Sequence, residues 1–113
     1  MEINWYEELP IAVTVCDKDG KIIYMNKKSA ATFEKYGAEH LIGDNVLNCH
    51  PEPAKSMLAA MLCNENTNAY TIEKNGIKKL IYQTPWYENG NYMGYVELSF
   101  VIPMEMKHFK RNP

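Results

Sequence analysis

Apolar and polar residues alternate through the last third of the chain, and this pattern predicts three antiparallel strands. The apolar runs are separated by two Asn-Gly pairs, Asn75-Gly76 and Asn89-Gly90. Asn-Gly supplies the positive φ angles that a two-residue hairpin turn requires, so each pair is expected to join neighbouring strands. Both sets of alternating positions contain apolar residues, which indicates that both faces of the sheet are covered.

The first third of the chain predicts a hairpin followed by a helix. Two apolar runs, residues 11–15 and 21–25, flank a turn at residues 17–20 that ends in Asp-Gly. Asn26 is a candidate N-cap for a helix over residues 27–36, because its side-chain oxygen can accept a hydrogen bond from a free backbone N–H in the first turn.

Two further helices are predicted from the apolar spacing. Apolar residues three apart within residues 3–9 indicate a short amphipathic helix that ends before Pro10. From Pro53, a favoured first helical residue, the apolar positions follow the helical period and predict a longer helix over residues 53–63. Residues 38–49 have no sustained period, which is typical of a connecting segment. This order of elements predicts an α+β domain with an antiparallel sheet.

The composition is that of one globular domain with little affinity for nucleic acid. Twelve basic and fourteen acidic residues give a net charge of −2, whereas nucleic-acid binding depends on neutralising phosphates. No apolar run is long enough to span a membrane and the N-terminus does not resemble a signal peptide, so we expect a cytoplasmic protein without membrane contact. Three cysteines at irregular spacing are expected to be reduced thiols.

Several motifs, taken in order, resemble the PAS domain family. The segment "DKDGKIIYMN" matches the family's D-x-x-G-x-I-x-x-x-N signature at Asp17, Gly20, Ile22 and Asn26. The closing "GNYMGYVELSFVI" is similar to the family's last strand, and "LIG" is similar to its step into the longest helix, although no glutamate stands at the usual place before it. The resemblance implies a five-stranded antiparallel sheet with helices packed on one face.

The same resemblance implies a division of the chain and a role. Residues 1–9 would be an N-terminal helix or dimerisation segment, residues 10–103 the PAS domain, and residues 104–113 a C-terminal tail. The domain would bind a small ligand or cofactor between the long helix and the sheet, and would signal through a homodimer or a partner protein. The carboxylates are scattered and no phosphate-binding glycine motif is present, so we expect no enzyme activity.

Seven residues are candidates for the wall of that pocket. They come from the Cys-His-Pro segment before the long helix, from that helix, and from the aromatic-rich late strands. They are Cys49, His50, Met57, Met61, Tyr70, Tyr82 and Trp86. Glu97 lies among apolar residues and is a further candidate acceptor, although an exposed edge position is the commoner reason for a glutamate there.

Haem is the cofactor for which the chain offers candidate ligands. PAS haem sensors usually take an axial histidine from the long helix, whereas here His50 precedes that helix and Met57 and Met61 lie one turn apart on it. The alternative is that the Cys-His-Pro segment only directs the chain into the helix. Flavin has less support, because "GDNVLNCH" departs from the flavin photosensor motif G-x-N-C-R-F-L-Q. Apart from His50 under haem, no metal ligand is expected, since one Cys-His pair gives too few zinc ligands.

Two other functions stay open. Cys49 stands beside His50 and before a helix, two features that can lower a thiol pKa, so a redox-sensing thiol is one alternative. The other is a protein-interaction or dimerisation module whose interior is filled by methionine and aromatic side chains. In the ligand-binding module, dimer contacts would use the N-terminal helix and the sheet face opposite the pocket.

Overall fold

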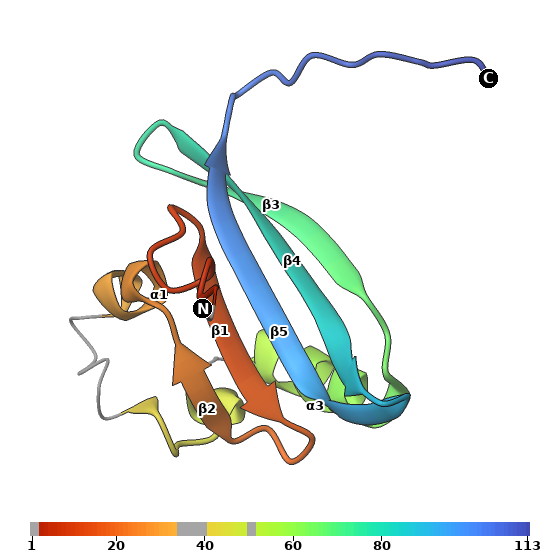
Figure 1. Ribbon diagram of the computed structural model, residues 1–113. Coiled ribbons are helices and arrows are strands. Elements are labelled where there is room, and N and C mark those ends of the chain that lie inside the picture. The colour runs from red at the N-terminus through yellow and green to blue at the C-terminus, as the bar shows by residue number, and fades with distance from the viewer. Residues whose placement is uncertain (1–2, 34–40, 50–51) are drawn as a thin grey trace.

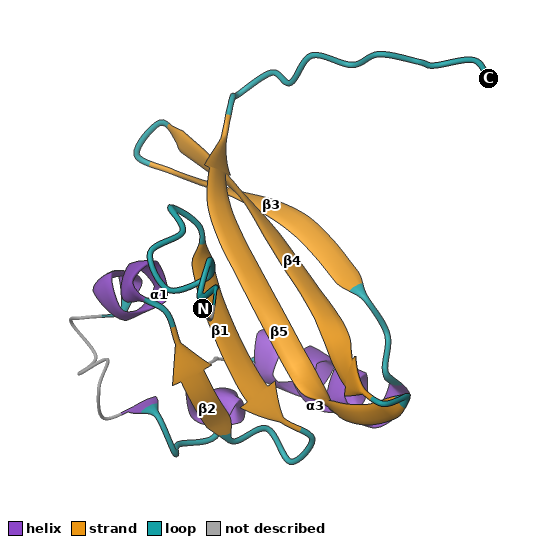
Figure 2. Cartoon of the chain, viewed as in Figure 1, coloured by secondary structure: helices purple, strands orange, loops and turns teal. Residues whose placement is uncertain are grey.

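One five-stranded antiparallel sheet forms the body of the molecule (Figure 1). This computed structural model describes residues 3–33, 41–49 and 52–113. The strands lie in the order β2-β1-β5-β4-β3, and α3 crosses behind them in the view of Figure 2. In chain order the elements are β1 (Ala12–Asp17), β2 (Ile22–Met25), α1 (Lys27–Thr32), the 3₁₀ helix η2 (Val46–Cys49), α3 (Ala54–Asn64), β3 (Asn68–Lys74), β4 (Ile77–Glu88) and β5 (Asn91–Ile102). The predicted α+β class with a five-stranded antiparallel sheet is confirmed.

Both Asn-Gly turns form as predicted. The φ angles are +53° at Asn75 and +76° at Gly76, and +52° at Asn89 and +81° at Gly90. Positive φ at both central residues is the geometry of a type I′ turn, whose twist matches that of the flanking strands. The two turns therefore fix the register in which β4 pairs with β3 and with β5.

Asn26 is the N-cap of α1, as the sequence predicted. Its Oδ1 atom accepts a hydrogen bond of 2.9 Å from the backbone N–H of Ser29. The helix ends at Thr32, and the predicted continuation to residue 36 falls outside the described residues. The predicted long helix agrees with α3 to within a residue at each end, because Pro53 takes the N-cap position and Glu65 ends the helix with φ +54°.

The predicted N-terminal helix is wrong for the residues that are described. Residues 5–7 form a turn, and no helix follows before Pro10. The local bond in this segment is from the Glu7 N–H to the Asn4 carbonyl at 3.1 Å, which closes a single turn. The Tyr6 carbonyl accepts a hydrogen bond from Asn26 Nδ2, and the Glu7 carbonyl accepts one from the Lys27 backbone N–H. Bonds to the start of α1 therefore hold this segment in place.

The inner face of the sheet is the face on which α3 packs. Cys16 of β1 and Tyr95 of β5, which are direct partners in the sheet, form a buried cluster with Leu58 and Met61 of α3. Since side chains alternate along a strand, their sequence neighbours point to the other side. The chain's main hydrophobic core thus lies between α3 and the inner face.

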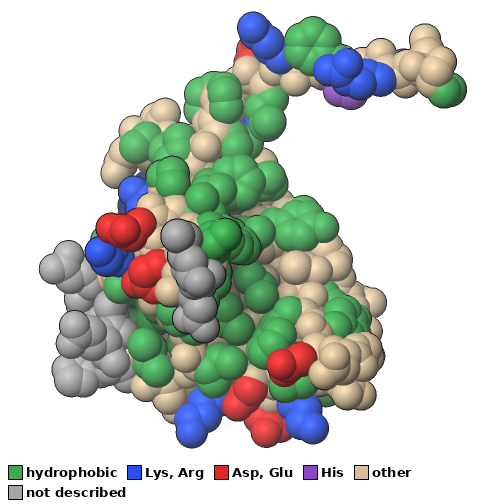
Figure 3. Space-filling model, viewed as in Figure 1, with side chains coloured by type: hydrophobic (Ala, Val, Ile, Leu, Met, Phe, Trp, Pro, Cys, Tyr) green, Lys and Arg blue, Asp and Glu red, His purple; other side chains and the backbone are tan. Residues whose placement is uncertain are grey.

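The opposite, outer face is apolar as well, and Figure 3 shows hydrophobic side chains gathered over it. Its residues on β1, β4 and β5 include Val13, Val15, Leu80, Tyr82, Thr84, Trp86, Val96, Leu98 and Phe100. The N-terminal segment covers the end of this face near β2, where the rings of Tyr6 and Tyr24 meet edge to face with centroids 5.4 Å apart. The Tyr24 hydroxyl also donates a hydrogen bond to the Glu7 carboxylate. The outer face is therefore covered in part only.

The C-terminal residues lie apart from this body. Residues 103–113 form no helix or strand and extend away from the end of β5 (Figure 1). Among the described residues, no helix combines the length and the apolar character needed to cross a membrane.

Candidate functional site

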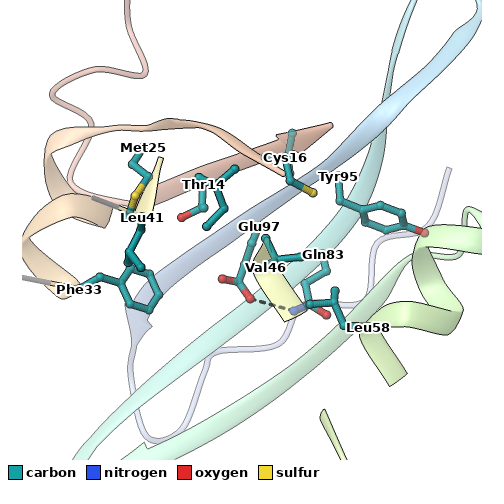
Figure 4. A pocket seen from close by; sticks show the side chains of 12 residues that line it. Thr14, Cys16, Met25, Phe33, Leu41, Val46, Leu58, Gln83, Tyr95 and Glu97 are labelled. Carbon is teal, nitrogen blue, oxygen red and sulfur yellow. Dashed lines mark hydrogen bonds between the residues drawn. The ribbon is translucent and has the colours of Figure 1, made fainter. Parts of the chain in front are cut away.

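A cavity of about 50 Å³ lies between the inner face of the sheet and the segments that cover it, and we call it the sheet cavity (Figure 4). Its wall is mostly apolar and is assembled from strands, helices and connecting segments far apart in the sequence. The lining residues are Thr14, Cys16, Ile22, Met25, Phe33, Leu41, Val46, Leu58, Gln83, Tyr95, Val96 and Glu97. An apolar wall with a few convergent polar groups is typical of small-molecule sites.

The polar groups of this cavity belong to a row that crosses the inner face. Thr14, Glu97, Gln83 and Asn68 come from four neighbouring strands, and each stands directly opposite the next in the sheet register. Opposite side chains on one face lie within reach of each other. Gln83 Nε2 donates to Glu97 Oε1 at 2.8 Å, and Asn68 Nδ2 donates to Gln83 Oε1 at 3.3 Å. Figure 4 shows the Glu97 carboxylate directed into the cavity beside Gln83.

The chemistry of the carboxylate fixes the direction of this row. An ionised glutamate side chain can only accept hydrogen bonds, so Gln83 must present its amide nitrogen to Glu97 and its amide oxygen to Asn68. The amide donors of Gln83 and Asn68 thus both point along the row toward Glu97. The second carboxylate oxygen, Oε2, makes no hydrogen bond to any residue in the described part of the chain. Unused acceptor capacity is therefore concentrated at one atom of the cavity wall.

At the other end of the row, a hydroxyl pair joins the sheet to α1. The Thr14 Oγ1 atom lies 2.5 Å from the Oγ atom of Ser29, which is fully buried. The short distance indicates a hydrogen bond between the two hydroxyls, with the proton on either oxygen. This bond holds α1 over the β1 end of the sheet cavity.

A second, larger cavity of about 340 Å³ adjoins the first and lies along α3; we call it the helix cavity. Leu58 and Gln83 line both cavities, so these two side chains form the boundary between them. The helix cavity brings together three of the residues singled out from the sequence, Met57, Met61 and Tyr70. Met61 is buried, whereas Met57 is 56% exposed and Tyr70 is 41% exposed.

Two other predicted pocket residues, Tyr82 and Trp86, line neither cavity, and their placement corrects the sequence prediction. They share the outer face with Leu80 and Thr84, while the cavities use Gln83 of the same strand. The indole Nε1 of Trp86 donates a 3.1 Å hydrogen bond to the Cys16 carbonyl, which fixes the ring against the β1 backbone. Alternation separated these two sets correctly, but it does not tell which set the helices cover.

The Cys-His-Pro candidates cannot be placed in either cavity. His50 lies outside the described residues, and of Cys49 the structure describes only the backbone, as the last residue of η2. Within residues 3–33, 41–49 and 52–113, no three side chains of the His, Cys, Asp and Glu types come together as a metal site would require.

None of the described residues that line the sheet cavity, Cys16 and Gln83 included, was among the seven candidates from the sequence, and for Glu97 an exposed edge position was preferred to a role as a pocket acceptor. Burial is the main reason that the pKa of the Cys16 thiol is raised, so this thiol is a poor nucleophile. The available signal for Glu97 and Gln83 was that each stands among apolar residues of the same strand face, next to Tyr95 and Ile81. A polar residue at a position where an apolar core residue is expected is a stronger sign of a functional site than an apolar residue at that position.

Two tyrosines of β5 fix the C-terminal end of α3 beside the helix cavity. The Tyr95 hydroxyl lies 2.6 Å from the Met61 carbonyl and 2.7 Å from the Asn66 carbonyl and shares one proton between them. The Tyr92 hydroxyl donates to the Leu62 carbonyl at 3.1 Å. The Leu62 carbonyl lies in the last turn of α3, where carbonyls have no partner within the helix, so the Tyr92 hydroxyl satisfies it. The Met61 carbonyl also accepts the Glu65 N–H at 2.9 Å, and the tyrosine bonds together hold α3 to the sheet.

Comparison with solved structures finds several PAS domains whose fold is similar to that of this chain. The PAS domain of BvgS from Bordetella pertussis superimposes with a TM-score of 0.66 at 17% identity, over 86% of this chain and 80% of that one. The Aer2 receptor from Vibrio cholerae, described as a dual PAS-heme oxygen sensor, gives 0.61 at 18% identity, over 82% and 95%. A PAS domain from Colwellia psychrerythraea gives 0.61 at 24% identity, over 86% and 90%. These likenesses establish the fold.

The sequence itself gives the family. A comparison with curated proteins found no match. The family model described as the PAS fold matches residues 6–72, which is more than half of the chain. This match includes the first hairpin, α1, α3 and most of β3, and the remaining strands, β4 and β5, complete the five-stranded sheet. The chain therefore belongs to the PAS fold family, whose domains serve as sensory and signalling modules.

Proposed function

We propose that this chain is a PAS sensory module that binds a small ligand between α3 and the inner face of the sheet. The observation that carries the proposal is the polar row that places the Glu97 carboxylate in the wall of a mostly apolar cavity. Placing a carboxylate in an apolar wall costs free energy unless a partner compensates it. A ligand that completes the hydrogen bonding of Glu97 would supply that compensation.

Signalling would follow if the ligand favours one position of α3 over another. Leu58 and Met61 place α3 against both cavities, and Tyr95 joins its end to β5. A ligand shifts such an equilibrium only by its differential affinity for the two positions. The helix that contacts the ligand is thus also the element that would report its presence.

The output would pass through a homodimer or a partner protein seated on the outer face. The N-terminal segment reaches only the β2 end of this face, and Tyr82 toward the other end is 38% exposed. Exposed contiguous apolar surface is characteristic of protein interaction sites. A non-catalytic role and a cytoplasmic location are part of the same proposal.

A filled interaction module is the second candidate, and one observation favours it. The sheet cavity measures about 50 Å³, below the roughly 300–1,000 Å³ of ordinary ligand pockets. In a filled module, the only role of Glu97 would be to accept the hydrogen bond from Gln83. The two candidates differ in whether the helix cavity is used by a ligand.

Haem fits the described residues poorly. No histidine is among the described residues that line either cavity, and burial raises the pKa of Cys16, whereas a thiolate ligand requires a lowered one. Met25, Met57 and Met61 are the remaining soft ligands among the described cavity residues, and Met57 is largely exposed. The proposals of His50 as an axial ligand and of Cys49 as a redox thiol are tested by an absorbance spectrum with added haem and by thiol titration.

The function is tested by blocking both cavities with one substitution. Leu58→Trp fills the boundary that the two cavities share, whereas Ala60→Trp adds the same side chain at an exposed position of α3. Thermal melting is measured for the wild type and both variants against a library of small metabolites. We expect library members that raise the melting temperature of the wild type and of Ala60→Trp but not that of Leu58→Trp. Ligands that stabilise all three proteins equally, or none of them, would favour the filled module.

A further inference from the structure

We infer that the ligand is a small organic cation with an apolar body, whose ammonium or other N–H donor group binds at Glu97. This inference rests on the proposed function and adds the chemical class of the ligand. The starting point is the direction of the polar row, in which each amide nitrogen points toward the carboxylate. Within the described part of the chain, Glu97 Oε2 receives no hydrogen bond and is the atom open to a ligand, and it is an acceptor.

Charge at the site points to the same class. Among the described residues, no lysine, arginine or histidine lines either cavity. The ion pair formed by described residues is between Lys27 and Glu8, both of which are largely exposed. A partly buried carboxylate without a cationic neighbour among the described side chains attracts a cation, because charges interact more strongly where water is scarce. An anionic ligand would meet the repulsion of the same carboxylate.

The surroundings of Glu97 suit the body of such a ligand. Phe33 and Tyr95 line the sheet cavity with aromatic rings, and aromatic faces stabilise organic cations. The sheet cavity has room for a head group, and beyond Gln83 the helix cavity offers about 340 Å³ between Tyr70 and the methionines of α3. Methionine side chains adapt to ligands of different shape. The arrangement therefore places a charged head deep in the site and an apolar body toward α3.

Binding of three probes that share one body tests the charge preference. The probes are 2-phenylethylamine, 2-phenylethanol and phenylacetate, which carry a cationic, a neutral and an anionic head, and binding to the full chain is measured by titration calorimetry. We expect the amine to bind at least about tenfold more tightly than phenylacetate, since a single charge contact of this kind is worth at least that factor. Equal affinities, or a preference for phenylacetate, would overturn the inference.

A charge-removing variant locates the effect. Glu97→Gln keeps the side-chain shape and an oxygen that can accept the bond from Gln83, and Glu88→Gln is a matched control at an exposed position of β4. We expect Glu97→Gln to weaken amine binding by about tenfold or more, and so to bring the affinities for the amine and for phenylacetate closer together. The affinities of Glu88→Gln should equal those of the wild type. Amine affinity that is the same in Glu97→Gln would overturn the inference.

The outcomes separate the ligand class from the proposed function. If Glu97→Gln does not fold, the comparison of the three probes on the wild type decides the class alone. If phenylacetate or the alcohol is the best probe, the class is wrong while ligand binding between α3 and the sheet stands. If no probe binds, the class is again contradicted, and the metabolite library with Leu58→Trp decides whether the chain binds any ligand.

Discussion

Asn26 connects three separate parts of the chain through one fully buried side chain. Its Oδ1 atom accepts hydrogen bonds from the backbone N–H groups of Val13 and Ser29, both at 2.9 Å. Its Nδ2 atom donates to the carbonyls of Tyr6 at 2.7 Å and Ile11 at 2.8 Å. All four capacities of the amide are thus used, and each partner is a backbone group that would otherwise be unpaired.

We expect Asn26→Ala to destabilise the protein by about 3 kcal/mol or more, since several buried backbone groups lose their partners at once. The measurement is urea unfolding followed by circular dichroism. Lys28→Ala, at an exposed position of α1, is the control and should change little. A loss below about 1 kcal/mol in Asn26→Ala would mean that water or a rearranged segment replaces the amide.

Gly94 allows β5 to approach β1 closely, and Gly90 provides a matched comparison. A Cβ atom at Gly94 would lie 2.0 Å from the Cys16 carbonyl oxygen, whereas one at Gly90 would meet nothing within 4 Å. Both residues have positive φ, +142° and +81°. We expect Gly94→Ala to cost about 3 kcal/mol or more in urea unfolding and Gly90→Ala about 1 kcal/mol. Similar costs would show that backbone conformation, rather than the close approach, is what matters at Gly94.

For single residues, the interactions that could be predicted from the sequence are those between neighbours along the chain. The N-cap role of Asn26 depends on residues three positions apart, so it could be predicted. Its bonds to Tyr6 and Ile11 depend on where the N-terminal segment lies in space, and the sequence gives no sign of them. The bond between Glu97 and Gln83 could not be predicted either, because it depends on the pairing of β4 with β5.

Among the elements, the contact between β5 and the end of α3 is sensitive to alkali. Burial is the main reason that the pKa of Tyr92 is raised from 10 to about 12, and the pKa of Tyr95 is raised for the same reason. A tyrosine whose folded-state pKa is raised stabilises the fold fully below the unfolded pKa and loses this contribution as pH rises through the folded pKa. The stability of the wild type should therefore fall between about pH 10 and 12.

Tyr92→Phe tests this contribution. The variant loses the hydrogen bond to Leu62, so we expect it to be slightly less stable than the wild type at pH 7. It also loses one group that titrates, so its stability should fall less steeply from pH 10 to 12. Urea midpoints measured at several pH values give both quantities. An unchanged slope would mean that Tyr92 ionises alike in the folded and unfolded chain.

The elements that could be predicted are those whose signals are contained within them. Two Asn-Gly pairs gave correct hairpins because the positive φ angles belong to the turn itself. The N-terminal segment forms a turn and no helix, and it is held by bonds from Asn26 and Lys27 to the carbonyls of Tyr6 and Glu7, which lie far along the chain from these donors. The alternation of β4 separated Tyr82 from Gln83, but the choice of the cavity-facing set required knowing where α3 lies.

For the molecule as a whole, the outer face predicts self-association. We expect sedimentation equilibrium to give twice the chain mass of 13.1 kDa. Tyr82→Arg places a charge on the outer face, and Tyr70→Arg places one at a similarly exposed site on the inner face. Tyr82→Arg should shift the protein toward monomer, since burying an unpaired charge is costly, while Tyr70→Arg should not. A wild type that stays monomeric, or equal effects of both variants, would place output on a partner protein instead.

The whole fold was the most predictable feature, because the order of elements and the family motifs agree with each other. The site was less predictable for a physical reason: each cavity is made by side chains that meet only after α3 packs on the sheet. Met57, Met61 and Tyr70 line the helix cavity because α3 and β3 both border it, and their part in ligand binding stays a prediction. Cys16 and Gln83 were missed because their role depends on register across strands.

The central claim, a ligand between α3 and the sheet, is tested most directly with methyl-labelled methionines. Met25 lines the sheet cavity and Met57 and Met61 line the helix cavity, while Met104 and Met106 lie exposed in the C-terminal segment. Methyl spectra are recorded with each stabilising member of the metabolite library. We expect a ligand that shifts Met25, Met57 and Met61 and leaves Met104 and Met106 unchanged. Spectra in which no ligand moves the three cavity methionines would contradict the account.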